Sequence, residues 1–185
     1  MNEKICTACG AVVESETARF CPECGALLPE EPARPDAGVL EEKLRARYRA
    51  YNDWAEEYRK KDGGARRLLS LVTSSSPFKN SEEHGIFFED VKARTEELLA
   101  AYREAPGSGD LPGMLNFALV GCHGFACTEA DWMFMAAEQL YMPMLDLISG
   151  DEAAALLGAY QKLRKRNNSF DFQKKIAKKL KSIGN

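Results

Sequence analysis

Histidine is scarce in this chain of 185 residues, which contains only His84 and His123. The sequence also lacks an HExxH motif, an ordered Ser-His-Asp set and a glycine-rich loop for binding phosphate. These absences leave zinc proteases, serine hydrolases and P-loop enzymes without the residues that their chemistry needs. An enzyme is therefore a class of function that no motif in the chain supports.

Long apolar segments are missing as well. The most apolar run, residues 111–126, is interrupted by Asn116 and His123 and does not reach the ~18 uninterrupted apolar residues of a membrane span. Residues 1–4 contain no apolar leader that would indicate secretion. We therefore expect a cytoplasmic protein without a transmembrane segment, in which the cysteines stay reduced.

Strand-like alternation of apolar and polar residues is absent beyond the first 28 residues, where helical spacing takes its place. Apolar residues recur every three or four positions, and glycine, proline, serine and asparagine separate the segments. The pattern predicts a mainly α fold in which an all-α bundle of six or seven helices forms the body. The expected helices begin near residues 39, 65, 81, 110, 128, 150 and 170.

The ends of these helices carry specific expectations. We place Ser81 and Thr128 as N-caps of the helices that begin near residues 81 and 128. In the helix from residue 128, the side chain of Asp131 should reach back to the first turn. Pro143 should kink or shorten that helix, because proline has no amide hydrogen to donate. Residues 110–124 are apolar nearly all round, which predicts a buried central helix.

Cysteine, in contrast, is concentrated near the N-terminus in two C-x-x-C-G motifs. Each motif places two thiolates on one tight turn, and two turns complete a tetrahedral set of four sulfurs for zinc. Gly10 and Gly25 follow the motifs, where the backbone needs a positive φ that glycine adopts without strain. We expect one structural zinc ion per chain with no open coordination position. The predicted ligands are Cys6, Cys9, Cys21 and Cys24.

These motifs, CxxCG and then CPxCG, resemble the short zinc ribbon found at the N-terminus of many bacterial and archaeal proteins. The resemblance covers residues 5–28 and implies a short β-hairpin that serves as a recognition or stability module. Rubredoxins hold redox iron with a similar pair of motifs and are the alternative. Their insert between the motifs is longer and rich in aromatics, whereas this insert has eleven residues and one aromatic, Phe20. Zinc is therefore the predicted metal.

The resemblance ends at a segment with three prolines, residues 29–38, which has an acidic bias and no large apolar residue. Such a segment cannot bury enough surface to fold, and its prolines keep it extended. We therefore predict three parts: a zinc ribbon at residues 1–28, a linker at 29–38, and an α-helical domain at 39–185 that ends in a basic helix.

A second group of metal-ligating residue types is Cys122, His123 and Cys127. A metal site there would need further ligands, and the only other histidine, His84, is some forty residues away. Our interpretation is that the two cysteines are small buried residues and that His123 ends a helix, where the helix dipole favours it.

Charge is distributed unevenly along the chain. Residues 161–185 contain nine Lys or Arg and one acid, Asp171, whereas the rest contains sixteen bases and twenty-seven acids. In the last helix Phe172, Ile176, Leu180 and Ile183 form an apolar stripe with lysines on the other faces. The stripe predicts packing against the body, and the lysines are either solvated or in contact with nucleic acid, an anionic membrane surface or an acidic protein.

Two classes of function follow. The first is a non-enzymatic interaction or adaptor protein, in which a structural zinc ribbon is tethered to a helical domain that binds a protein partner. The second is a nucleic-acid-associated protein that uses the basic C-terminal helix. The ribbon disfavours the second class, because residues 1–28 contain four glutamates against Lys4 and Arg19. We therefore expect any nucleic-acid binding to be weak.

Overall fold

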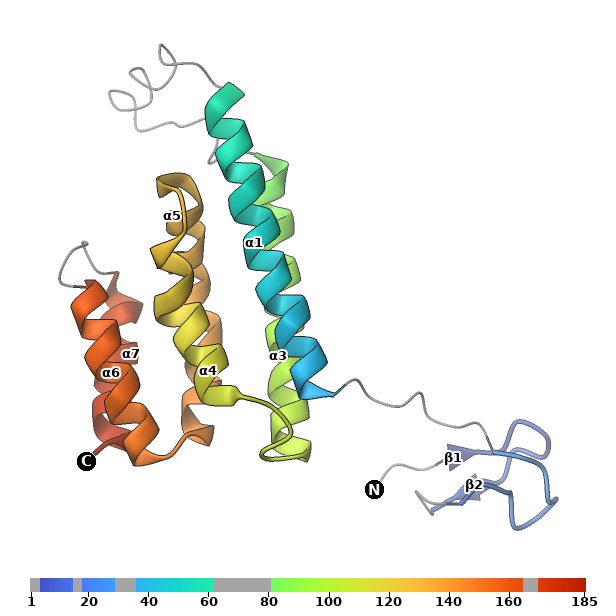
Figure 1. Ribbon diagram of the computed structural model, residues 1–185. Coiled ribbons are helices and arrows are strands. Elements are labelled where there is room, and N and C mark those ends of the chain that lie inside the picture. The colour runs from blue at the N-terminus through green and yellow to red at the C-terminus, as the bar shows by residue number, and fades with distance from the viewer. Residues whose placement is uncertain (1–3, 15–17, 29–35, 62–80, 165–169) are drawn as a thin grey trace. The chain divides into compact units, whose positions relative to one another are not determined.

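The computed structural model of the protein describes residues 4–14, 18–28, 36–61, 81–164 and 170–185. The chain divides into two compact units, residues 1–35 and 36–185, which we call the ribbon and the helical body (Figure 1). The described part contains six α-helices and one minimal pair of strands, so the mainly α prediction is confirmed. The helix expected near residue 65 lies outside the described residues.

The ribbon contains two strands of two residues each, β1 (Lys4–Ile5) and β2 (Val12–Val13). They pair antiparallel, with Ile5 opposite Val12. A further bridge joins Phe20 to Leu27 at the equivalent positions of the second cysteine motif. Two aliphatic side chains and two sulfurs are too small a core to hold such a module without a cross-link or a metal. That buried core consists of Cys6, Val13, Cys21 and Leu28.

Helix α1 (Ala37–Lys61) begins two residues before the predicted start, inside the segment that we assigned to the linker. The backbone oxygen of Asp36 accepts a hydrogen bond from the amide of Leu40 at 3.1 Å, and its carboxylate accepts one from Gly38 at 2.7 Å. These bonds satisfy amides of the first helical turn. Gly38 therefore enters the helix in spite of its low helix propensity.

Helix α1 packs along α3 (Glu82–Glu104) (Figure 1). Tyr48 and Tyr51 of α1 are fully buried against Phe87 of α3, with ring centroids 5.4 Å and 4.1 Å from that ring. Arg47 donates to Glu83 at 2.8 Å and to Asp90 at 2.9 Å across the same interface. The two longest helices are thus joined by aromatic packing and by charge. Ser81 is the N-cap residue of α3 as predicted, although its side chain makes no capping hydrogen bond.

The central segment changes pitch along its length. It runs through α4 (Leu111–Asn116), a π-helical turn η2 (Phe117–Gly121) and a 3₁₀ turn η3 (Cys122–Gly124). The Asp110 side chain caps α4 by accepting a hydrogen bond from the Gly113 amide at 3.0 Å. The prediction of a buried central segment is confirmed, but the segment is not one regular α-helix. Its buried side chains are Met114, Leu115, Ala118, Leu119 and Cys122.

Helix α5 (Thr128–Ala137) has Cys127 as its N-cap residue, so the placement of Thr128 as the cap is wrong. The amide of Cys127 donates to Asn52 Oδ1 at 2.9 Å, and this long-range bond fixes the residue that precedes the helix. Asp131 does not complete a cap either, because its carboxylate bonds the ring of His123. A contact between distant parts of the chain has overridden the local capping pattern.

The 3₁₀ helix η4 (Glu138–Leu147) follows α5 directly and contains Pro143. The predicted shortening of the α-helix is confirmed, but the change of pitch comes at Glu138, before the proline is reached. Pro143 has no amide hydrogen to donate, so a regular α-helix could not continue through it unbroken. Glu138, the first residue of η4, is fully buried.

The last two helices, α6 (Gly150–Arg164) and α7 (Asp171–Ile183), pack against each other (Figure 1). Ile176 and Leu180 of α7 are fully buried, and Phe172 and Ile183 are partly buried against the same core. The prediction that the apolar stripe of this helix packs on the body is therefore confirmed. Among the described residues, no helix combines the length and the apolar character that crossing a membrane requires.

Candidate metal centre

The backbone of each cysteine motif repeats the same two hydrogen bonds. Gly10 donates to the Cys6 carbonyl at 2.8 Å, and Gly25 donates to the Cys21 carbonyl at 2.9 Å. Both glycines adopt the positive φ that the motif predicts, 76° and 69°. The amide of the first cysteine in each motif is also bonded, to the carbonyl of the residue that follows the glycine. The two turns are therefore copies of one local structure.

The two turns bring all four sulfurs together. The Sγ atoms of Cys6 and Cys24 are 3.6 Å apart, as are those of Cys9 and Cys21, and all four lie within 4.8 Å of one another. A tetrahedral zinc ion with Zn–S bonds of about 2.3 Å requires sulfurs about 3.8 Å apart. The four predicted ligands are thus placed as one set that can hold one metal ion.

The electrostatics of the cluster also favour a bound cation. Backbone hydrogen bonds from Ala8 and then Cys9 lower the pKa of the Cys6 thiol to about 7. A backbone hydrogen bond from Ala11 lowers the pKa of Cys9, but the thiols of Cys24 and Cys6 outweigh it and raise that pKa to about 12. The first thiolate therefore forms readily and suppresses the ionisation of its neighbours, which a divalent cation would reverse.

Exposure divides the four ligands into two kinds. Cys6 and Cys21, the first cysteine of each motif, are buried in the ribbon core. Cys9 and Cys24, the second of each motif, are exposed. Because four protein sulfurs fill a tetrahedral shell, a metal held here has no position left for water or substrate.

Cys122, His123 and Cys127 lie in the helical body and form no second cluster of this kind. Among the described residues, the four ribbon cysteines are the set of three or more Cys, His, Asp or Glu residues that could hold a metal ion, with their sulfurs within 4.8 Å of one another. The Cys122 thiol donates to the Ala118 carbonyl at 3.2 Å, and burial raises its pKa. Burial also raises the pKa of Cys127. Both cysteines are buried in the main core, in agreement with our interpretation of them as packing residues.

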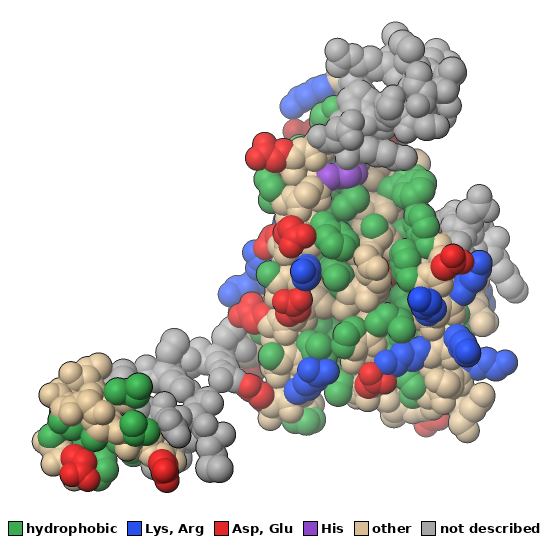
Figure 2. Space-filling model, turned by 180° about the vertical axis from the view of Figure 1, so that it is seen from behind, with side chains coloured by type: hydrophobic (Ala, Val, Ile, Leu, Met, Phe, Trp, Pro, Cys, Tyr) green, Lys and Arg blue, Asp and Glu red, His purple; other side chains and the backbone are tan. Residues whose placement is uncertain are grey.

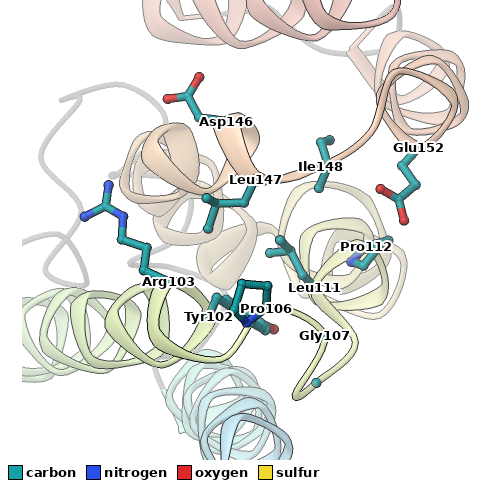
Figure 3. A pocket seen from close by; sticks show the side chains of 11 residues that line it. Tyr102, Arg103, Pro106, Gly107, Leu111, Pro112, Asp146, Leu147, Ile148 and Glu152 are labelled. Atoms are coloured by element: carbon teal, nitrogen blue, oxygen red, sulfur yellow. The ribbon is translucent and has the colours of Figure 1, made fainter.

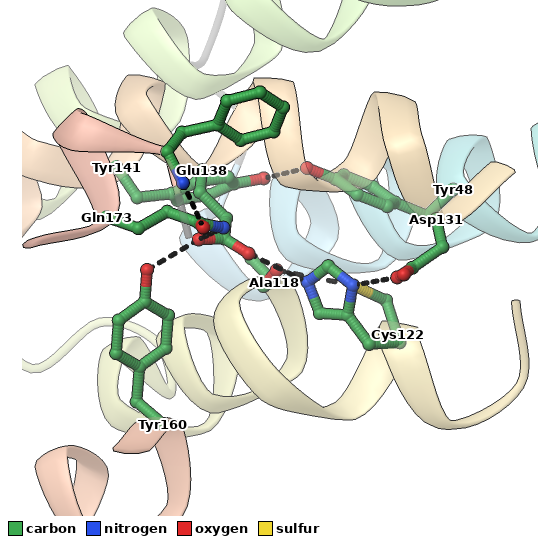
Figure 4. A network of polar contacts seen from close by, with 10 residues as sticks. Tyr48, Ala118, Cys122, Asp131, Glu138, Tyr141, Tyr160 and Gln173 are labelled. Atoms are coloured by element: carbon green, nitrogen blue, oxygen red, sulfur yellow. Dashed lines mark hydrogen bonds and ion pairs between the residues drawn. The ribbon is translucent and has the colours of Figure 1, made fainter. Parts of the chain in front are cut away.

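His123 does more than end a helix. Its side chain is 1% exposed; Nδ1 contacts the Asp131 carboxylate, and Nε2 lies 3.0 Å from Glu138 Oε1 (Figure 4). Burial alone lowers the pKa of His123, but hydrogen bonds to Asp131, Cys122 and Glu138 outweigh it and raise the pKa to about 11. The ring is therefore a buried imidazolium between two carboxylates.

Glu138 extends this cluster to the last two helices. Its second carboxylate oxygen accepts hydrogen bonds from the Tyr160 hydroxyl at 2.6 Å and from Gln173 Nε2 at 2.9 Å (Figure 4). Gln173 Oε1 in turn accepts from the Phe170 amide at 3.0 Å. One fully buried carboxylate thus connects η3, η4, α6 and α7.

The sequence carries two signals of this cluster that our interpretation missed. Glu138 is a charged residue directly after the apolar α5, and Gln173 lies three residues before Ile176, on the buried side of α7. Polar residues at core positions indicate a bonded network, because an unpaired one would be costly. Neither position identifies its partner, since the partners come from other helices.

The body also has an open pocket of about 590 Å³ between the end of α3 and the junction of η4 with α6 (Figure 3). Asp146 and Glu152 lie on opposite sides of it. Asp146 accepts from Lys179 at 2.6 Å, and Glu152 accepts from the amide and hydroxyl of Ser149 at 2.8 Å. These carboxylates are occupied by structural bonds and do not converge as a pair for acid–base chemistry.

No protein-family model, no curated protein and no solved structure matches this chain.

Proposed function

We propose that this protein is a zinc-binding interaction protein, in which a structural zinc ion shapes the ribbon and the helical body binds a protein partner. The observation that carries the proposal is the convergence of four thiol sulfurs within 4.8 Å. Four protein ligands close the shell of a zinc ion, so the metal stabilises a fold and performs no reaction. Zinc binding would then serve to fold the ribbon and so to form its surface.

Zinc is favoured over iron by the insert between the two motifs. Tetrahedral sulfur ligation suits either metal. The eleven-residue insert has Phe20 as its only aromatic, and Phe20 is 61% exposed, so the sulfurs lack the aromatic cover that a rubredoxin-like insert provides. A structural site of thiolates needs reducing conditions, which supports placing the protein in the cytoplasm.

The helical body supports an interaction role more than an enzymatic one. His123 and Glu138, its buried ionisable pair, are enclosed and bonded to other side chains. A catalytic acid or base must reach a substrate, and neither group lines the pocket found among the described residues. The described carboxylates of the open pocket are separated and already bonded.

The experiment that tests the proposal combines metal analysis with capture. Protein purified without added metal should contain about one zinc ion per chain, and the Cys6→Ser/Cys21→Ser variant should contain none. The full chain, used as bait in an extract of its native cell treated with nuclease, should retain a protein partner. Iron as the dominant metal, or capture that disappears with nuclease, contradicts the proposal.

A nucleic-acid-associated function is the second candidate, and the exposed lysines of α7 are the observation that favours it. Two of the lysines are already paired, Lys174 with Asp171 at 3.0 Å and Lys179 with Asp146 at 2.6 Å. We therefore expect weak binding to DNA or RNA that is lost near physiological salt. Sub-micromolar binding at that salt would promote this candidate, provided that it disappears when four lysines become glutamine. Those lysines are Lys174, Lys175, Lys178 and Lys179.

A further inference from the structure

We propose that the ribbon binds a basic, partly apolar segment of a partner protein through two exposed apolar pairs, Ile5–Val12 and Phe20–Leu27. This inference rests on the proposed interaction function and adds to the binding by the helical body a second surface, on the ribbon, with a stated partner chemistry. All four residues are largely exposed to solvent: Ile5 is 63% exposed, Val12 54%, Phe20 61% and Leu27 67%.

Each pair is one continuous apolar surface. Ile5 lies directly opposite Val12 in the β1–β2 ladder, and Phe20 is bridged to Leu27 in the same manner. Side chains at opposed positions have Cβ atoms about 5 Å apart, so they touch and exclude water together. The two pairs also occupy equivalent positions, one residue before the first cysteine and three after the second cysteine of each motif.

The ribbon does not need these side chains for its own core. Val13 and Leu28, the neighbours of Val12 and Leu27, point inward and are 4% and 2% exposed. Successive residues of a strand face opposite sides, so the outer positions could be polar without loss of internal packing. Clusters of exposed apolar side chains of this kind mark sites of interaction.

The helical body also exposes apolar side chains, which Figure 2 shows over one of its faces, and exposed Trp132 lies against Phe170, with ring centroids 5.2 Å apart. Its large exposed apolar residues come from separate elements, and no two of them are paired across a ladder. The set is Val39, Ile86, Phe125, Trp132 and Leu147.

Charge determines which partner fits. The described ribbon carries exposed Glu14 and Glu23 as well as exposed Arg19, and red and green side chains lie together on the ribbon face that Figure 2 shows. Residues 1–28 contain four glutamates against two bases. Four thiolates around a divalent zinc ion add a net charge of about −2. The loaded ribbon is therefore an anionic module with an apolar surface, and its complement is a segment in which Lys or Arg accompanies apolar residues.

The same charge argues against other occupants. Phosphate of a nucleic acid and the headgroups of an anionic membrane would both meet an excess of negative charge. An acidic peptide would be repelled for the same reason. The proposal therefore commits to a basic protein segment.

The test uses two synthetic amphipathic peptides with identical leucine positions, one with lysine and the other with glutamate at the remaining positions. Each is titrated into the full-length, zinc-loaded chain labelled with ¹⁵N. The lysine peptide should shift the amide resonances of Ile5, Val12, Phe20 and Leu27, and added salt should weaken its binding. The glutamate peptide should shift none of them. Equal binding of the two peptides would overturn the assignment of the partner.

Two ribbon variants test the surface itself. Phe20→Ser/Leu27→Ser should weaken the lysine peptide by about tenfold or more, since two large apolar contacts are lost. Ile5→Thr/Val12→Thr keeps β-branched residues in the strands. Its affinity for the lysine peptide tests the surface if the first variant loses zinc. The matched control is Val39→Ser/Ile86→Ser, whose two sites on the body are each 50% exposed and which should bind normally.

The outcomes separate this inference from the proposed function. If zinc-loaded variants bind the lysine peptide as well as the parent chain does, the apolar pairs are not the site. If the lysine peptide does not bind while the parent chain still captures a protein partner, the surface assignment fails and the interaction function stands. If zinc is absent from the parent chain, the proposed function fails first.

Discussion

The ribbon and the helical body each bring like-charged groups together, and they neutralise them in different ways. In the ribbon four thiol sulfurs lie within 4.8 Å of one another, and a metal ion from solution would supply the cation. In the body the carboxylates of Asp131 and Glu138 flank His123, whose protonated ring supplies the cation from within the chain. Stability of the ribbon therefore depends on free metal, and stability of the body depends on pH.

The difference follows from the size of the two cores. Each described helical element of the body contributes buried apolar residues, so the ion cluster is an addition to a core that exists without it. The ribbon has two buried aliphatic residues, Val13 and Leu28, and its other buried side chains are two cysteines of the candidate metal site. Removing the cation should therefore abolish one fold and only weaken the other.

The largest expected effect is that of removing the metal. A strong chelator should disorder the ribbon completely, because structural zinc contributes about 10–16 kcal/mol of apparent folding free energy in modules of this kind. The helical signal at 222 nm should change little. Amide resonances of residues 4–28 would collapse while those of the body stay dispersed. Melting of the helices on chelation would show that the two units do not fold independently.

Removing the cation of the body should have the next largest effect. His123→Gln leaves Asp131 and Glu138 without their shared positive partner and should lower the free energy of unfolding by about 3–5 kcal/mol. Urea unfolding of the body measures it. The control is His84→Gln, which removes the hydrogen bond with the Tyr51 hydroxyl and should cost about 1 kcal/mol. Equal losses in the two variants would contradict a special role for the buried cluster.

The pH dependence of stability should distinguish the two units by its sign. The pKa of His123 is raised from 6.5 to about 11 in the folded protein. Its stabilisation is therefore complete below pH 6.5 and declines as pH rises toward 11. Between about pH 7 and pH 9 the free energy of unfolding of the parent chain, measured by urea unfolding, should therefore fall by about 3 kcal/mol through this residue.

The ribbon should respond in the opposite direction. Zinc ligands must be deprotonated, so acid releases the metal and base does not. A zinc-sensitive dye would report release as pH falls, while circular dichroism of the body stays constant. Release of zinc in mild base, with the body intact, would contradict the expectation that acid, and not base, releases the metal.

The smallest effect is expected for the two buried cysteines of the body. Cys122→Ala/Cys127→Ala should lower the free energy of unfolding by about 1–3 kcal/mol through lost burial. Zinc content should stay the same as in the parent chain. A second equivalent of metal that disappears in this variant would show that these thiols are ligands after all.

The ribbon could be predicted from the sequence because its determinants are local. Each cysteine motif is six residues long and contains its own turn, its glycine and its two ligands. Helix periodicity likewise predicts α1, α3 and α7 with their buried faces, since an apolar stripe identifies the side that packs. Ends set by the helix's own side chains were also accessible, as Asp110 at the start of α4 illustrates.

The buried cluster could not be predicted because its contacts join distant residues. Glu138 meets Tyr160 and Gln173, which are 22 and 35 positions further along the chain. The same reason explains the wrong cap at Thr128, because the position of Cys127 is fixed by Asn52, 75 residues earlier. A local sequence pattern can indicate that a polar residue is buried, but the packing of the helices determines which residue it bonds to.

The alternation of buried and exposed ligands has a consequence for how quickly the metal exchanges. An incoming ligand can replace a protein sulfur only where it can reach the coordination shell. Cys9 and Cys24 are reachable from solvent, whereas Cys6 and Cys21 are covered by the ribbon core. For an ion bound at these four sulfurs, replacement would therefore begin at one exposed sulfur in each turn and could proceed stepwise while the ribbon is still folded. A tightly held ion can in this way have a short residence time, and that time shortens as the concentration of a competing thiol or chelator rises.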